Sequence, residues 1–464
     1  MPTQPISFGL SSGPGRFGPD AGARLINAYA EQAPKDAKYP WLLFCRPGLT
    51  NFATLTGGAF RGAIDLDGVG YVVNGTAVNK VDSTGTVTSI GSFTGSGPVF
   101  MARNRKSPNP QIAIVSSGIR AYIEADVVSN ITDTDLPAPI ACDSIGGYIV
   151  FAIEDGRYFW TSIDNLTSIN ALDFRSAEAN PDGLVGIKTR GQEIILFGPR
   201  SVEFHALTGS TLVFERVSQS TLDLGCLSGA AVKDLNGVVI FPASDFTVRR
   251  LNGYSPERIS THAVERSIES LANKSVMTAW TFQLQGHQFY VLNAPSFTWA
   301  CDLLTSNWYE WSSYQAARWQ AEGFLAIGGK RIVGDYAVAK LYELDPDVGQ
   351  DAGEYLIWKL ISGAAGQFPN RFVADHIYLD LVVGVGTPTE TNPQIMLRTS
   401  NDDARSWSSE MQRPIGAQGD YKRQVSFRSL GSSGQDGMRF EIAVSANVVR
   451  CLQGAALRYT PIAA

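Results

Sequence analysis

Residues 61–81 read RGAIDLDGVGYVVNGTAVNKV, in which short apolar runs are separated by Asp67-Gly68 and Asn74-Gly75. Asp-Gly and Asn-Gly pairs between such runs are typical of two-residue β-hairpin turns. The same alternation of strand-like run, turn and second run recurs along the chain. The seven runs are GYVVNGTAVNKV from Gly70, IAIVSSGIRAYI from Ile112, YIVFAIEDGRYFWTSI from Tyr148, EIILFGPRSVEFHAL from Glu193, VVIFPASDFTVRRL from Val238, QFYVLNAPSFTWACDL from Gln288 and RIVGDYAVAKLYEL from Arg331.

The spacing of these hairpins is regular, with a mean of roughly 43 residues, and a four-stranded propeller blade repeats every 40–45 residues or so. A single blade cannot bury both faces of its sheet, whereas blades packed face to face around an axis can. The alternative interpretation is an unrelated series of hairpins in a sandwich. We predict an all-β fold with a β-propeller of about seven blades over residues 56–351.

A glycine turn precedes six of the seven hairpins, and the second hairpin has Asn109-Pro110 instead. Type I′ and II′ turns need a positive φ, which glycine adopts without strain. Each unit is therefore expected to be a three-stranded meander with a fourth strand in the segment that follows. The last unit lacks an obvious fourth strand, and we expect either Tyr355–Leu360 or Trp41–Cys45 to supply it.

Two flanking segments lie outside the repeat. Residues 1–55 begin with a stretch rich in Gly and Pro and are predicted to form an extended N-terminal arm. On this interpretation, deletion of residues 1–40 leaves a folded monomer that no longer assembles. Residues 352–464 follow a polar stretch and contain short alternating runs, which predict a C-terminal β-sandwich. A helix is predicted over Thr261–Asn273 from its apolar spacing.

The composition of the 464 residues excludes several classes of protein. The formal net charge of −6 argues against a general electrostatic grip on nucleic acid, since such domains are usually basic. The five cysteines are scattered, without a CxxC pair, and the four histidines are isolated. We therefore expect reduced thiols and no metal site. No targeting segment or membrane-spanning stretch is visible, so a soluble protein without a membrane anchor is expected.

Several short motifs fail their context tests. Gly13–Gly18 fits GxGxxG, yet neither a strand before it nor a helix after it is predicted. Gly9–Gly13 fits GxSxG but lies in the expected arm rather than on a strand-to-helix elbow. The basic groups at 103–106 and 249–250 are more simply solvated loops. No pair of carboxylates stands out for glycoside hydrolysis. We assign no catalytic, cofactor-binding or metal-binding residue and no cofactor.

Residues 400–407, SNDDARSW, are similar to the Asp-box pattern S-x-D-x-G-x-T-W, with Ala404 in place of the glycine and Ser406 in place of the threonine. In proteins that carry it, the box braces a hairpin turn through the Asp side chain, and its Trp packs inward. It occurs in sialidase propellers away from their catalytic centres. The motif therefore indicates structure rather than catalysis.

Several short phrases occur in order along the chain: NAY at 27–29, RPGL at 46–49, RG at 61–62, GSGPVFMA at 95–102, RISTHAVE at 258–265, the turn at 400–407 and RSLG at 428–431. Taken together, they resemble the podovirus tail-hub proteins, also called nozzle or packaged-DNA-stabilisation proteins. The resemblance implies a non-enzymatic virion protein at the end of a short phage tail, made in the host bacterial cytoplasm.

The same resemblance implies a set of partners. The subunits are expected to form a homo-hexamer below the portal-adaptor ring, to bind a tail needle or plug and tailspike or tail-fibre proteins, and to retain packaged DNA. Double-stranded DNA would pass through the channel during ejection without specific binding. The alternative function is a sialidase-like or carbohydrate-binding propeller, a receptor-binding tail protein, since nine Trp would suit sugar stacking. Three arginines or a close carboxylate pair on one propeller face would favour that alternative.

The charge is divided unevenly along the chain. Residues 352–464 hold 11 basic and 10 acidic residues, a net of +1, and the remainder carries a net of −7. An acidic or neutral channel wall would repel the duplex and keep it centred. A charge of −7 that merely keeps the domain soluble explains the same numbers.

Overall fold

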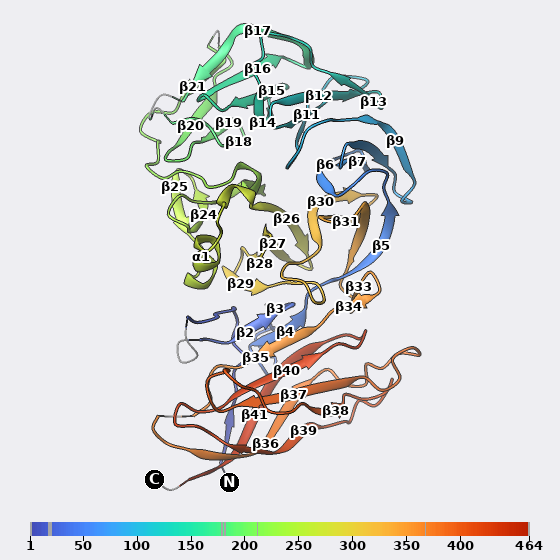
Figure 1. Ribbon diagram of the computed structural model, residues 1–464, viewed down its shortest axis with the longest axis vertical. Helices are drawn as coiled ribbons and strands as arrows, with labels where there is room; N and C mark the ends of the chain where they lie inside the picture. Colours follow the sequence, from blue (N-terminus) through green and yellow to red (C-terminus); the bar gives the residue numbers. More distant parts are fainter. Residues whose placement is uncertain are drawn as a thin grey trace.

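The computed structural model describes residues 2–16, 21–177, 180, 182–210, 212–366 and 368–462. Figure 1 shows two bodies stacked along the long axis, a ring of sheets above and a smaller pair of sheets below, with both chain ends at the lower end. Strands dominate the described residues, and the single α-helix among them is α1 (His262–Glu269). The predicted all-β class is confirmed.

The upper body is the β-propeller that the hairpin repeat predicted. Among the described residues it contains seven four-stranded antiparallel units. The first four units are β6 (Phe60–Leu66), β7 (Val69–Asn74), β8 (Ala77–Val81) and β9 (Val87–Ser92); β10 (Phe100–Arg103), β11 (Ile112–Ser116), β12 (Ile119–Glu124) and β13 (Val127–Asn130); β14 (Pro139–Ile145), β15 (Tyr148–Ile153), β16 (Arg157–Ser162) and β17 (Asn165–Ser176); and β18 (Gly186–Arg190), β19 (Glu193–Phe197), β20 (Val202–Leu207) and β21 (Phe214–Arg216). The last three are β22 (Lys233–Leu235), β23 (Val238–Pro242), β24 (Val248–Asn252) and β25 (Ser255–Arg258); β26 (Thr278–Leu284), β27 (His287–Ala294), β28 (Phe297–Asp302) and β29 (Asn307–Glu310); and β30 (Ala321–Ile327), β31 (Lys330–Asp335), β32 (Lys340–Asp345) and β5 (Gly48–Thr54).

The first strand of each unit lines the axis of the ring. These inner strands contact one another in sequence, from β6 through β10, β14, β18, β22 and β26 to β30, and β30 contacts β6 again. Apolar side chains fill the spaces between adjoining blades, such as Val73 with Ile114 and Val72 with Ile332. Face-to-face packing thus buries the sheet faces that a single blade would leave exposed.

The turns that join the first two strands of a blade have the expected backbone conformation. Asp67 and Gly68 have φ of 52° and 77°, and Asn236 and Gly237 have φ of 55° and 80°. Two consecutive positive φ values define a type I′ turn, whose twist matches that of the flanking strands. The turn residues in the sequence therefore fix the register of these hairpins.

Strand β5 (Gly48–Thr54) closes the ring. It pairs antiparallel with β32, from Leu49 opposite Leu344 to Thr54 opposite Lys340. Neither segment expected at this position is the ring-closing strand, and that prediction was wrong. The run 41–45 is β4 (Trp41–Cys45) of the lower body, and the run 355–360 enters β35 (Trp358–Ile361) there. The residues of β5 carry no turn signal, because their partner strand lies far away in the sequence.

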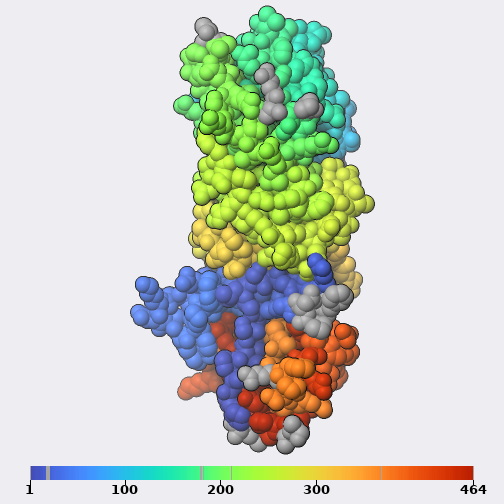
Figure 2. All heavy atoms as spheres, turned by 90° about the vertical axis from the view of Figure 1, so that its left-hand side faces the viewer, coloured from blue at the N-terminus to red at the C-terminus, as the bar shows by residue number. Residues whose placement is uncertain are grey.

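The N-terminal segment does not form a free arm, which corrects the prediction of an extended arm over residues 1–55. Its described part forms β1 (Thr3–Pro5), β2 (Arg24–Ile26), β3 (Ala28–Gln32), β4 and β5. Leu25, Ala28 and Ala30 are fully buried. Figure 2 shows this segment in blue as a band between the propeller and the lower body. Strands β1, β2 and β5 were missed because their partner strands lie hundreds of positions away, whereas β3 pairs locally with β4, which in turn joins the distant β41.

The lower body is the predicted β-sandwich, which is confirmed. One sheet has the strand order β3-β4-β41-β36-β39, with β1 added to β41, and the other runs β2-β35-β40-β37-β38. The further strands here and at the junction are β33 (Gln350–Asp351), β34 (Glu354–Tyr355), β36 (Phe372–Leu381), β37 (Gln394–Ser400), β38 (Met411–Pro414), β39 (Val425–Ser432), β40 (Arg439–Val444) and β41 (Cys451–Pro461).

Strand β2 joins the two bodies into one sheet. It runs parallel to β29 of the sixth blade, with Ile26 opposite Glu310, and antiparallel to β35 of the sandwich. The Arg24 guanidinium reinforces the pairing through an ion pair of 2.6 Å with Glu310. A continuous sheet of nine strands therefore crosses the junction.

A buried ion pair lies where the chain passes from sandwich to propeller. Arg46 and Asp351 are both fully buried, and two hydrogen bonds of 2.9 and 2.6 Å join the guanidinium to the carboxylate. The three remaining N–H groups of Arg46 donate to Asn27 Oδ1, the Pro47 carbonyl and the Ser312 carbonyl. All five donors of the guanidinium are thus satisfied without water.

The predicted helix is present as α1, with Thr261 at its N-cap position and Val264 and Ile268 buried. It packs against the fifth and sixth blades. Two short 3-10 turns, η2 (Gly229–Ala231) and η3 (Lys274–Val276), complete the helical residues described.

Substitution of Asp351 tests the buried pair. Asp351→Ala leaves the Arg46 charge buried without its counter-ion, so we expect the free energy of unfolding to fall by about 3–5 kcal/mol. Denaturant unfolding measures this change. Asp347→Ala, an exposed change four residues away, is the matched control and should stay within about 0.5 kcal/mol of the parent. A loss below about 1 kcal/mol for Asp351→Ala would contradict the role given to the pair.

Deletion of residues 1–40 tests the integration of the N-terminal segment. The truncated chain loses β1, β2 and β3 and uncovers the core that Leu25 and Tyr29 fill, so we expect an insoluble product or a protein without a cooperative unfolding transition. The control Lys35→Ala alters an exposed turn residue of the same segment and should leave solubility and unfolding unchanged. Recovery of a stable, soluble monomer after the deletion would restore the free-arm interpretation.

Candidate functional site: the central cavity of the propeller

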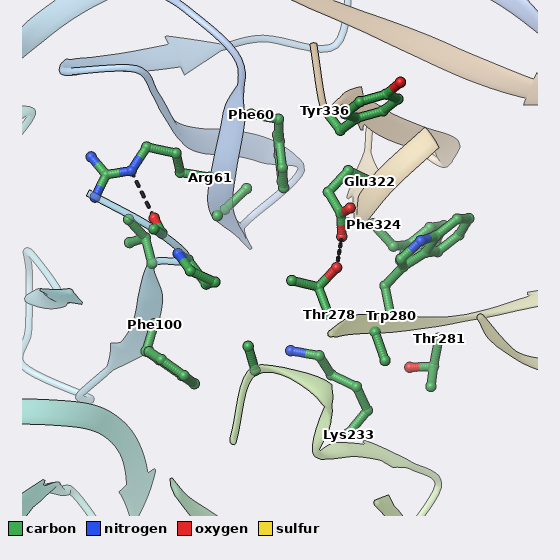
Figure 3. A pocket seen from close by; sticks show the side chains of 18 of the residues that line it. Phe60, Arg61, Phe100, Lys233, Thr278, Trp280, Thr281, Glu322, Phe324 and Tyr336 are labelled. Carbon is green, nitrogen blue, oxygen red and sulfur yellow. Dashed lines mark hydrogen bonds between the residues drawn. The ribbon is translucent and has the colours of Figure 1, made fainter. Parts of the chain in front are cut away.

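A cavity with a volume of about 540 Å³ lies on the propeller axis. Its walls come from the first residues of the inner strands β6, β10, β22, β26 and β30, so five blades converge on it. The cavity therefore sits toward the face of the ring where the inner strands begin. Figure 3 shows the side chains that surround it.

Much of the wall is aromatic. Phe60, Phe100, Trp280, Phe324 and Tyr336 line the cavity from four blades. The close approach of Phe60 to the seventh blade is possible because glycine occupies positions 323 and 334, where an added Cβ would meet the Phe60 ring at 2.4 and 2.1 Å. The cavity thus offers extended apolar surface around a few polar groups, as small-molecule sites commonly do.

The Arg61 guanidinium is held by the protein itself. It donates to the carbonyls of Gly97 and Gly75, each at 2.8 Å, and to Ser116 Oγ at 3.1 Å. These acceptors are neutral, so the charge of Arg61 has no carboxylate partner among its hydrogen bonds. Burial lowers the pKa of Arg61 from its ordinary value. In Figure 3 the guanidinium points away from the centre of the cavity.

The carboxylate in the wall, Glu322, is fully engaged. It accepts hydrogen bonds from Thr278 Oγ1 at 2.8 Å and from the Arg318 guanidinium at 2.6 Å. The Arg318 guanidinium also stacks on Tyr336, 4.2 Å from the ring centroid. Glu322 is therefore an ion-paired and hydrogen-bonded group of the wall, with both carboxylate oxygens engaged by the protein.

Lys233 is the exception in this wall. Within the described part of the chain its ammonium group has no hydrogen-bond or ion-pair partner. Figure 3 shows the nitrogen directed toward the space between the labelled side chains. Burial, and secondarily the charge of nearby Lys188, lower the pKa of Lys233 to about 8. Lys188 differs because it forms an ion pair of 2.8 Å with Asp143, and the pKa of Lys188 is raised.

The cavity can be compared with the features that would favour a sialidase-like or other glycosidase function. Its described lining contains one arginine, Arg61, and one carboxylate, Glu322. The described lining thus does not present the three arginines or the close pair of carboxylates that would favour the alternative function. The polar groups that it does present suit binding of an anion better than acid–base chemistry.

The Asp-box-like segment braces a turn at the end of β37. Asp402 Oδ1 accepts from the Ser406 N–H at 2.9 Å and from Ser400 Oγ at 2.8 Å, and the hydrogen bonds from Ser406 lower the pKa of Asp402 to about 2. Ala404 adopts φ of 66°, the conformation for which the pattern uses glycine. Trp407 is only partly buried and faces the Arg398 guanidinium at 5.7 Å. The turn therefore resembles the pattern, while its Trp does not pack inward as expected.

The other residues considered in the sequence are dispersed. All five cysteines are free thiols, and burial raises their pKa values. No group of three or more potential metal ligands occurs among the residues described. Arg249 and Arg250 lie on β24 rather than in the expected loop, and they form ion pairs with Asp245 and Glu257. Part of the 13–18 motif lies outside the described residues.

Sequence reasoning missed Lys233 and Glu322. Both lie near the start of an inner strand, in VKDLNG and AEGFLAI, where an isolated charge looks like the polar face of an ordinary strand. The available signal was that charged residues also occur in the first strands of the third and fourth units, at Asp143 and Lys188. Because the inner strands of a propeller surround its axis, such charges must face one another or the central cavity.

In the described residues, no helix has the length and apolar character needed to cross a membrane.

These observations define a two-domain all-β protein, a propeller joined to a sandwich through shared strands. The chain belongs to the bacteriophage P22 Gp10 family. The model of that family's β-propeller matches residues 26–349, and the model of its β-sandwich matches residues 357–458. The resemblance to podovirus tail-hub proteins is thereby confirmed.

A curated relative and several solved structures are similar to the chain. It is 23% identical over 287 residues to the tail hub protein gp10 of Salmonella phage P22, covering 56% of this chain and 60% of the relative's length. The WD40 propeller domain of Doa1 aligns with a TM-score of 0.41 and 10% identity, over 64% of this chain and 97% of that domain. PorZ of Porphyromonas gingivalis aligns with a TM-score of 0.40 and 10% identity, over 78% of this chain and 46% of PorZ.

The lowered pKa of Lys233 leads to a stability prediction. Below about pH 8 the folded protein holds a charge that it disfavours, so Lys233→Met should stabilise it at pH 7 by on the order of 1–2 kcal/mol. As the pH rises from about 8 toward 10.5, the amine loses its proton in the folded state first, and the parent should approach the variant in stability. Denaturant unfolding at pH 7 and pH 10 measures the difference.

Lys422→Met serves as the control, because Lys422 is exposed on the sandwich and should change stability little at either pH. The environment described for Lys233 would be contradicted if Lys233→Met were no more stable than the parent at pH 7, or if its gain in stability were the same at both pH values.

Proposed function

We propose that the chain is a structural tail-hub subunit of a short-tailed phage. The main support is that the propeller and sandwich models of one tail-hub family match this chain in the same order and over most of its length. The identity with the tail hub of phage P22 supports the same role. The proposed location is the virion tail, and the proposed role is non-enzymatic.

The architecture suits a protein that bears load between two contacts. The propeller and the sandwich share the continuous sheet through β2, and the buried pair of Arg46 and Asp351 lies at the same junction. Inter-domain interfaces within a chain are often small and mobile, whereas strands shared by both domains resist hinge motion. A subunit built in this way transmits displacement along its long axis, as a hub between a head and distal tail proteins requires. The proposed domain limits stay at 56–351 and 352–464, with the N-terminal segment divided between the two.

The proposed assembly is a homo-hexameric ring below a portal-adaptor ring, in contact with a needle or plug and with tailspikes or fibres. Ring formation needs a heterologous interface that closes on itself. The DNA path in such an assembly runs between subunits. A cavity of about 540 Å³ cannot hold a duplex whose major groove alone is about 12 Å wide.

The charge of the chain favours passage of DNA over binding. The portion before residue 352 carries a net charge of −7, and phosphate contacts made by Lys and Arg are what give non-specific DNA affinity. Retention of DNA would then come from mechanical closure of the ring rather than from adhesion to its wall.

Electron microscopy of reconstituted particles tests the proposal. We expect the purified protein to add a ring below the portal-adaptor complex encoded with it, and to protect DNA in filled particles that lack it from added nuclease. Particles without the protein, and particles given the Asp351→Ala variant, are the controls. Failure to bind the complex would overturn the hub assignment. Binding without nuclease protection would reject the retention role alone.

A further inference from the structure

The wall of the propeller cavity contains a cation that the protein leaves unsatisfied. Arg61 makes three hydrogen bonds within the fold, and Glu322 is paired with Arg318. In the described structure Lys233 has no such partner, although its nitrogen projects into the space between the blades (Figure 3). Among the described residues, the arrangement leaves the positive charge of Lys233 in the cavity wall without an ion-pair partner.

This charge is not needed for packing. A partly buried ammonium without a partner costs stability, and an apolar side chain of similar length would fill the same space at lower cost. Residues that reduce stability in this way concentrate at binding and catalytic sites. The position of Lys233 therefore indicates a ligand that supplies the missing negative charge.

From this geometry we propose that the cavity binds a small organic carboxylate with an aromatic or other apolar body, its carboxylate on the Lys233 ammonium. The volume of about 540 Å³ lies within the usual range of roughly 300–1,000 Å³ for small-molecule sites. The rings of Phe60, Phe100 and Trp280 supply apolar surface for the body of the ligand. The inference rests on the cavity alone and is independent of assembly into a tail.

The wall favours a single carboxylate over phosphate or sulfate. Sites for multiply charged anions use several free donors, such as backbone N–H groups at a helix start or the fork of an arginine. The donors of Arg61 are already directed to Gly75, Gly97 and Ser116. One ammonium remains, which matches one carboxylate.

Charged groups from every neighbouring element bear on Lys233. Lys188 of β18 is neutralised by Asp143 of β14, and Glu322 of β30 is neutralised by Arg318. Asp234 lies next to Lys233, and burial raises the pKa of its carboxyl. Because Asp143 and Glu322 are each paired with another cation, the Lys233 ammonium is the charge in this wall that remains for a bound carboxylate. Affinity should fall as the pH passes the pKa of Lys233, near 8 before binding.

Calorimetric titration of the full chain with phenylpropionate tests the proposal. We expect one phenylpropionate site per chain. Phenylpropionamide, which has the same shape without the charge, should bind at least about tenfold more weakly than phenylpropionate, and inorganic sulfate should bind as weakly as the amide. Lys233→Met should reduce phenylpropionate affinity at least about tenfold, whereas Lys233→Arg should retain most of it. The exposed-site control Lys422→Met should bind as the parent does.

Three results would overturn the proposal: no binding of phenylpropionate, equal affinity in the parent and Lys233→Met, or sulfate binding as tight as phenylpropionate. Near-ultraviolet circular dichroism of each variant verifies that the propeller is folded. If Lys233→Met fails this check, Lys233→Gln replaces it. A negative outcome leaves the hub assignment untouched, since that assignment is tested by assembly onto the portal-adaptor complex.

Discussion

The buried ion pair between Arg46 and Asp351 is the point on which the two domains depend. The chain leaves the sandwich at Cys45 and enters the propeller at Gly48, so Arg46 marks the crossing itself. Asp351 marks the return, at the end of the last blade. Trp319 covers the guanidinium face at 4.5 Å, and Asn27 accepts one of its hydrogen bonds, so four separated segments of the chain are fixed by one side chain.

The buried charge of Arg46 is tolerable because all of its N–H groups find acceptors within the fold. The five N–H groups of Arg46 meet five acceptors, and Asp351 receives two of them in parallel. Buried ion pairs seldom add much net stability. They do disfavour other packings of the two domains, because any other arrangement leaves a buried charge without its partner. The pair therefore specifies how the domains join more than it strengthens the joint.

The sequence predicts the blades better than the segments that connect them. The hairpins from Gly70 to Leu344 have local turn residues, such as Asn236-Gly237, and each strand pairs with its neighbour in the chain. Strands β1, β2 and β5 pair with residues several hundred positions away, as β4 does with β41, and no local pattern encodes such partners. Lys233 escaped notice for a related reason: its neighbours in the cavity come from five different blades.

Closure of the ring by β5 has a consequence for the order of events during synthesis. Thr54 leaves the ribosome long before Lys340, its partner 286 residues later. At translation rates of roughly 5–20 residues per second, β5 waits about 15–60 s without the strand that it will join. Its exposed edge is open to wrong pairing in that interval. The nascent chain is thus exposed to misfolding until its last blade emerges, so cellular chaperones have reason to hold it.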